Sequence, residues 1–111
     1  MFCGTFDGRV DNRGRLNIPV GLGGDICGEL LYLKQGIDDC VEIHTEVEPY
    51  FIKPHFFKGE MKKLFPVIGN KRKRMIRIPV ALIEQSYSFW FDNKVTLVGK
   101  GSYIRLLPRP N

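Results

Sequence analysis

Two clusters of basic residues occupy short segments that also contain turn-forming residues. In the first cluster, Arg13 and Arg15 flank Gly14. The second cluster has five cations within seven residues, namely Lys71, Arg72, Lys73, Arg74 and Arg77. No acidic residue stands between Glu60 and Glu84, so nothing in the local sequence relieves the repulsion among these cations. A polyphosphate backbone would relieve it, because binding releases the condensed counterions of the nucleic acid.

Arginine side chains suit such a partner. A guanidinium group offers two parallel hydrogen bonds to a phosphate or to the edge of a guanine. A two-stranded β-ribbon fits the major groove, so a hairpin whose turn carries cations is a physically sensible reader of duplex DNA. The alternative, from the residues alone, is a solvated basic face without a partner.

The distribution of charge along the chain is strongly uneven. Residues 1–60 have 6 Lys and Arg against 10 Asp and Glu, a net charge of −4, whereas residues 61–111 have 11 against 2, a net charge of +9. Such a dipolar chain favours either a polyanionic partner for its second half or self-association of unlike surfaces.

Catalytic and metal-binding constellations are weak in this sequence. The histidines, His44 and His55, have no Ser or Cys at a recognisable nucleophile spacing, and Cys40 does not complete a metal-ligand pattern with them. Three cysteines without a Cys-x-x-Cys pair indicate buried, reduced thiols rather than disulfides or a zinc site. No apolar run approaches the ~18 residues of a membrane span. We therefore expect a cytoplasmic protein that is not an enzyme and has no cofactor or metal ion.

A repeated segment positions the two basic clusters. Residues 16–22, Leu-Asn-Ile-Pro-Val-Gly-Leu, recur at residues 76–82 as Ile-Arg-Ile-Pro-Val-Ala-Leu. Such a repeat indicates two similar half-units, neither of which buries a core alone. We predict a first half-unit over residues 1–48, a partly helical connector over 49–64 and a second half-unit over 65–108, which together form one pseudo-symmetric domain over 1–111.

Alternating polar and apolar residues predict that both half-units consist mainly of short strands. Asp11 and Gly14 signal a tight turn between the first two strands, since Asx side chains bond their own backbone and glycine accepts a positive φ. The glycines of residues 20–27 favour a loop or one poor turn, whereas residues 80–85 predict a short helix. The predicted strands cover residues 2–10, 15–19, 30–34, 40–44, 65–69, 75–78, 95–98 and 103–107. The expected fold class is therefore mostly β with short helices.

The first half-unit carries a recognisable set of motifs. It opens with Met1-Phe2-x-Gly-Thr-Phe, continues with Asp11-x-x-Gly14-Arg15-Leu16-x-Ile18-Pro19, and ends near Val41-Glu42-Ile43-His44. These motifs resemble those of the MraZ family, bacterial transcriptional regulators of the division and cell-wall gene cluster that also carry two tandem copies of this unit. The resemblance implies a swapped-hairpin, double-psi-like barrel of the AbrB/SpoVT type. It also implies sequence-specific binding of double-stranded DNA, association with the nucleoid and a ring-like homo-oligomer.

The same resemblance assigns roles to the first basic cluster. Asn12, Arg13 and Arg15 would be its DNA-reading residues. Gly14 would provide the turn that presents them, and Asp11 would hold the geometry of that turn.

The second copy departs from the family pattern at its turn. Lys71 stands where Asp is expected, Arg74 where Gly is expected, and Met75 where Arg is expected. We therefore expect this cluster to add a sequence-independent grip on phosphates through Lys71, Arg72, Lys73, Arg74 and Arg77. The alternative is an oligomeric protein-interaction module that kept the fold and lost specific DNA reading.

Overall fold

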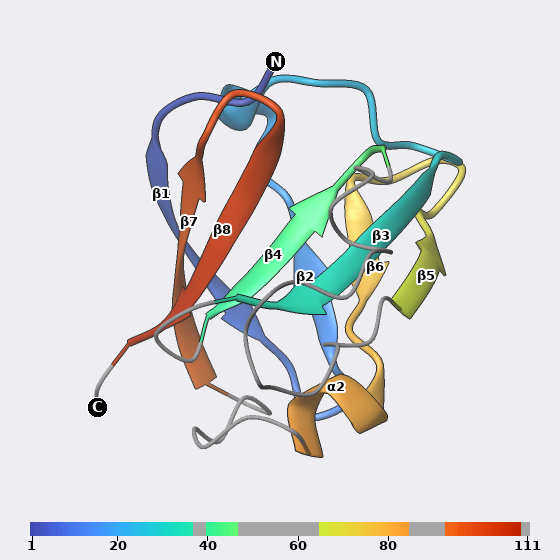
Figure 1. Ribbon diagram of the computed structural model, residues 1–111, viewed down its shortest axis with the longest axis vertical. Helices are drawn as coiled ribbons and strands as arrows, with labels where there is room; N and C mark the ends of the chain where they lie inside the picture. The colour runs from blue at the N-terminus through green and yellow to red at the C-terminus, as the bar shows by residue number, and fades with distance from the viewer. Residues whose placement is uncertain (37–39, 47–64, 85–92, 110–111) are drawn as a thin grey trace, which may run out of the picture.

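The computed structural model describes residues 1–36, 40–46, 65–84 and 93–109, which form an eight-stranded antiparallel sheet curled into a nearly closed barrel (Figure 1). The strands are β1 (Thr5–Val10), β2 (Arg15–Asn17), β3 (Leu30–Gln35), β4 (Val41–His44), β5 (Phe65–Ile68), β6 (Met75–Arg77), β7 (Asn93–Gly99) and β8 (Tyr103–Pro108). A 3-10 turn, η1 (Val20–Leu22), follows β2, and a short helix, α2 (Val80–Glu84), follows β6. The predicted class, mostly β with short helices, is confirmed.

Strand pairing joins the two halves of the chain. The order in the sheet is β5-β3-β4-β8-β7-β1-β2-β6, and the end strands β5 and β6 also contact each other. Each strand of the first half therefore has a partner from the second half, in the pairs β1–β7, β2–β6, β3–β5 and β4–β8. In the β2–β6 pair, Leu16 lies opposite Ile76, its own equivalent in the repeat. The two copies of the repeated segment therefore lie side by side in the barrel, paired as neighbouring strands.

The core occupies the inside of this barrel, as the alternation in the sequence predicts. Leu16 and Ile76 are both 1% exposed, and they lie among inward residues of the other strands such as Leu33, Leu97 and Ile104. Equivalent leucines close the two ends of the barrel, where η1 and α2 lie (Figure 1). These leucines, Leu22 and Leu82, are fully buried and belong to the same hydrophobic cluster.

Most predicted elements are found, with shifts at their ends that have local causes. The first strand begins at Thr5 because Gly4 adopts a φ of +90°, and Phe2 instead forms an isolated bridge with Gly101. The glycine-rich segment forms only the short η1, as expected, and the predicted helix after β6 is confirmed. The predicted connector over residues 49–64 lies outside the described residues.

The three cysteines are free, but only Cys40 is buried; Cys27 is half-buried and Cys3 is exposed, so the expectation of buried thiols is wrong for Cys3. Neither helical segment in the described ranges has the length and apolar character that a transmembrane helix requires.

Candidate nucleic-acid interface

The turn between β1 and β2 is organised by one carboxylate. Asp11 Oδ1 accepts hydrogen bonds from the backbone N–H groups of Arg13, at 2.9 Å, and Arg15, at 2.8 Å. The N–H of Gly14 donates to the Asp11 carbonyl oxygen at 3.1 Å, and Gly14 adopts a φ of +82°, which favours glycine. The turn therefore has the Asx geometry that its sequence indicates, and it directs the exposed Arg13 side chain outward.

The same carboxylate also holds an arginine. Asp11 Oδ2 accepts a hydrogen bond from Arg15 Nε at 2.6 Å, in an ion pair whose side chains remain 35% and 46% exposed. The pKa of Asp11 is lowered, chiefly because the backbone N–H of Arg15 donates to the carboxylate. Contact through Nε leaves the two terminal nitrogens of Arg15 available to a partner.

The antiparallel pairing of β2 with β6 adds a third arginine to this turn. Arg77 lies opposite Arg15 in the sheet, and its Nε donates to the Arg13 carbonyl oxygen at 3.1 Å. Sequence proximity groups Arg77 with residues 71–74. The structure instead places it beside Arg13 and Arg15, because β6 runs away from its own turn toward the other one.

The turn between β5 and β6 uses a residue that the sequence interpretation missed. Asn70 Oδ1 accepts from the backbone N–H groups of Arg72, at 2.8 Å, and Lys73, at 3.0 Å, and the Asn70 N–H donates to the Met75 carbonyl oxygen. Asn70 thus takes the place of Asp11 in a turn that is one residue longer. The residue type indicates this role, since Asn forms Asx turns as well as Asp does. The sixty-residue offset of the repeat, however, aligns Lys71 rather than Asn70 with Asp11 and so hides the equivalence.

Arg74 is turned toward the protein. Its Nε donates to the carbonyl oxygen of Ile18 at 3.0 Å, Nη1 donates to Gly24 at 2.6 Å, and Nη2 donates to Pro19 at 3.2 Å and Gly23 at 2.7 Å. One guanidinium group therefore ties the second turn to the segment around η1. Because its donors are used in these hydrogen bonds, Arg74 stabilises the fold. Phosphate binding by this turn, as predicted, would depend on its other cations.

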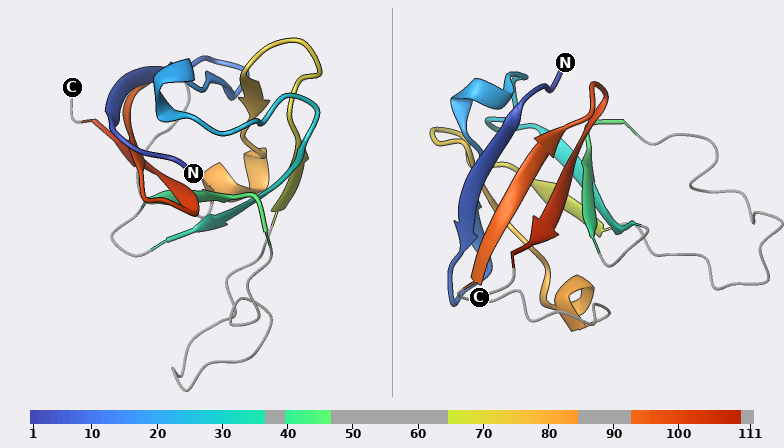
Figure 2. Two further views of the ribbon diagram at one scale, coloured as in Figure 1. Left: turned by 90° about the horizontal axis from the view of Figure 1, so that it is seen from above. Right: turned by 90° about the vertical axis from the view of Figure 1, so that its left-hand side faces the viewer.

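The two turns lie at opposite ends of the β2–β6 pair, hereafter the ribbon (Figure 1). In the part of the chain that the structure describes, four cationic side chains in these turns are exposed and make no hydrogen bond or ion pair: Arg13, Lys71, Arg72 and Lys73. The ribbon lies across the barrel from β4 and β8, as the view from above shows (Figure 2). The structure thus separates the predicted cations into two groups joined by one rigid strand pair.

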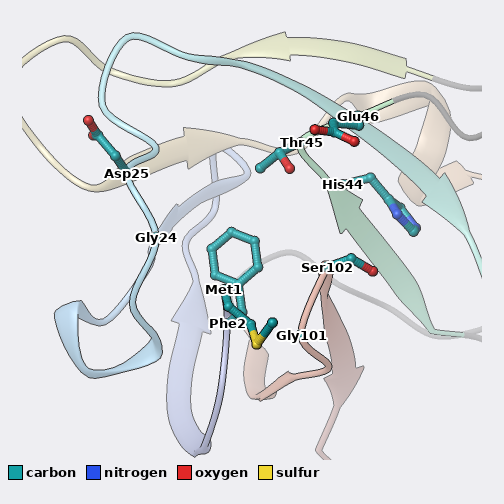
Figure 3. Close-up of a pocket in the computed structure, with 9 residues that line it drawn as sticks. All are labelled: Met1, Phe2, Gly24, Asp25, His44, Thr45, Glu46, Gly101 and Ser102. Carbon is teal, nitrogen blue, oxygen red and sulfur yellow. The ribbon is translucent and has the colours of Figure 1, made fainter.

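A pocket of about 410 Å³ lies at the end of the barrel that carries η1 and the β7–β8 turn (Figure 3). Phe2 is at its centre, and Asp25, His44 and Glu46 are among its lining residues. None of the cations predicted to bind DNA lines it. Its carboxylates make it a poor site for phosphates, so the pocket is distinct from the candidate interface.

His44 in this pocket has structural partners. Its Nε2 lies 2.9 Å from Glu42 Oε1, and its ring stacks on Tyr103 with the centroids 4.7 Å apart. The pKa of Glu42 is lowered, first by the hydrogen bond with His44 and then by the charge of Lys34. Among the described residues, no group of three His, Cys, Asp or Glu side chains is arranged to hold a metal ion.

Protonation of Asp11 is expected to loosen the first turn. Because folding lowers the pKa of this carboxyl group, the order it provides is present above its unfolded-state pKa and is lost as the pH falls through the folded-state value. The backbone amide resonances of Arg13 and Arg15 should therefore titrate together, with a midpoint below that of an ordinary aspartate. Asp11→Asn, which keeps the acceptor oxygen, should remove the titration. Amides that titrate separately, or at the ordinary value, would contradict this role.

In comparisons with known proteins, the chain matches no protein-family model and no curated protein.

Proposed function

We propose that this chain is a sequence-specific DNA-binding transcriptional regulator with a swapped-hairpin barrel of the AbrB/MraZ type. The observation that carries the proposal is the placement of free cationic side chains at both ends of one exposed ribbon. Each turn is held by an Asx side chain, so the backbone that carries the cations has little conformational freedom left to lose on binding. The pairing of every first-half strand with a second-half strand supports the finer assignment of the fold.

The two groups of cations suit different parts of a duplex. Arg13, Arg15 and Arg77 form a cluster of guanidinium groups, which match both phosphates and guanine edges. Lys71 and Lys73 are point charges that match phosphates without reading sequence. The first turn is therefore the reading end, and the second turn is the gripping end. As part of the same proposal, copies of this chain associate into a ring-like homo-oligomer in the nucleoid, which multiplies weak contacts along one duplex.

An exposed apolar pair on the sheet supports a second candidate function, binding to another protein. Leu30 and Ile68 lie opposite each other on β3 and β5, and they are 44% and 70% exposed. An exposed apolar pair of this kind favours contact with a protein. A protein-interaction module that does not read DNA is therefore the alternative, and salt dependence separates the two.

Binding of the wild-type protein to an unrelated 30-bp duplex should weaken steeply with salt. Each phosphate contact contributes about 0.9 to the slope of log K against log salt, so the triple variant Lys71→Ala, Arg72→Ala, Lys73→Ala should lower that slope by up to about 3. Lys100→Ala, a cation in the β7–β8 turn, is the control and should change it little. The measurement is fluorescence anisotropy of the labelled duplex across a salt series. No binding at low salt would exclude DNA as the partner and favour the alternative.

A further inference from the structure

The ribbon has one buried face and one exposed face. Leu16 and Ile76 lie at the centre of its two strands and point into the core. Alternation along each strand turns the neighbouring side chains to the opposite, outer face. The residues of this outer face are Arg15, Asn17, Met75 and Arg77. Asn17 was not among the residues predicted to bind DNA.

The two ends of the outer face carry different chemistry. Arg15 lies opposite Arg77, and Asn17 lies opposite Met75. In the sixty-residue repeat, Arg15 is equivalent to Met75 and Asn17 is equivalent to Arg77. A perfect repeat would therefore place the same pair at both ends. Divergence of the copies has instead produced a guanidinium pair at one end and an amide beside a thioether at the other.

Both arginines of this face are bound within the protein through Nε. Arg15 is bound to Asp11 through Nε, and Arg77 is bound to the Arg13 carbonyl oxygen through Nε. Within the described residues, the terminal nitrogens of both guanidinium groups make no further hydrogen bond or ion pair. These nitrogens are the donors that contact guanine O6 and N7. Their geometry is thus arranged before any partner binds.

We propose that this outer face reads base edges in the major groove and that the sequence element read by one copy of the chain is non-palindromic. The inference rests on the proposed DNA-binding function. Arg15 and Arg77 specify guanine. Asn17 specifies adenine through its N6 and N7 atoms, and Met75 contacts the methyl group of thymine. Arg13 extends this reading surface at the first turn, and the second turn, with Lys71–Lys73, contacts the flanking phosphates.

The dimensions of the ribbon fit this arrangement. A strand rises about 3.3 Å per residue, and B-DNA rises about 3.4 Å per base pair along one strand. Side chains two positions apart, such as Arg15 and Asn17, therefore meet base pairs about two steps apart when the ribbon follows the groove. The guanine contacts and the A·T contact should occupy fixed, neighbouring positions in one site.

Selection of preferred sites from a random 20-bp duplex library tests the proposal. The motif selected by the wild-type protein should contain a non-palindromic element with guanine at one end and an A·T pair at the other. Asn17→Ala should lose roughly tenfold to a hundredfold of discrimination at the A·T position and keep the guanines. Asn17→Asp should shift that position from adenine toward cytosine, whose amino group donates to a carboxylate. A merely structural role for Asn17 would not produce such a switch.

The controls separate failure of this inference from failure of the proposed function. Thr5→Ala, an exposed position on β1, should select the wild-type motif, and circular dichroism should show that every variant is folded. A wild-type motif that lacks guanine and A·T pairs at neighbouring positions, or an Asn17→Asp variant that selects the wild-type motif, would overturn the base-reading assignment while salt-dependent binding leaves the proposed function standing. A wild-type protein that binds no duplex at low salt would overturn both.

Discussion

Replacing both Arg13 and Arg15 with alanine should remove most of the discrimination between a selected duplex and random DNA. Arg13 extends freely from the turn, and Arg15 holds two terminal donors toward solvent. A good bidentate contact to a base is worth about 1–3 kcal/mol of discrimination, so the loss of two such groups should remove most of the preference. The ratio of dissociation constants for the two duplexes, measured by anisotropy at one salt concentration, reports the effect.

The charge-preserving variant Arg13→Lys, Arg15→Lys is the matched control. A lysine keeps the positive charge and loses the planar fork, so this variant should retain binding to random DNA and still lose most of the discrimination. Wild-type discrimination in the alanine variant would show that the first turn is not the reading end. The two Asp11 Oδ1 bonds to backbone N–H groups do not require either side chain, so the turn itself should persist.

Replacing Arg74 with methionine should destabilise the fold by about 3 kcal/mol. The substitution keeps most of the aliphatic stem and removes the guanidinium group that donates to four backbone carbonyl oxygens. Hydrogen bonds to charged groups contribute about 1.5–3 kcal/mol each, and the partial exposure of this site and the sharing of one side chain keep the total below their sum. The midpoint of urea-induced unfolding measures the change.

Arg72→Met is the control for this prediction. Arg72 occupies the same turn and carries the same charge, but its side chain makes no hydrogen bond within the described residues. Its replacement should change the free energy of unfolding by less than about 0.5 kcal/mol. Arg74→Lys should resemble Arg74→Met, because one ammonium group cannot span four acceptors. Equal urea midpoints for Arg72→Met and Arg74→Met would contradict the assigned role of Arg74.

The strands and the first turn were accessible from the sequence because they depend on local patterns. Polar and apolar alternation locates β2 and β6, and Asp11 with Gly14 indicates their kind of turn before any contact is known. The glycines before Cys27 correctly predict a poor helical turn. Such features are determined by residues within a few positions of one another.

The different roles of the individual cations could not be predicted from local sequence in the same way. Residues 71–74 read as a uniform basic run, yet Arg74 faces inward because the η1 segment, some fifty positions earlier in the chain, offers carbonyl oxygens within its reach. Arg77 belongs to the other turn because β2 and β6 pair antiparallel. Both assignments depend on which strands lie side by side, and local sequence carries no information on that choice.

The pairing between the two halves also bears on how the chain reaches its native state. Thr5 pairs with Val98, so β1 has its main neighbour almost at the far end of the described chain. The entropy of closing such a long loop must be lost before the contacts form, which slows folding relative to chains with local contacts. During synthesis, the first-half strands emerge from the ribosome well before their partners exist. Two of them, β1 and β4, remain exposed edges until β7 and β8 follow, and in that interval they are open to pairing with the wrong chain.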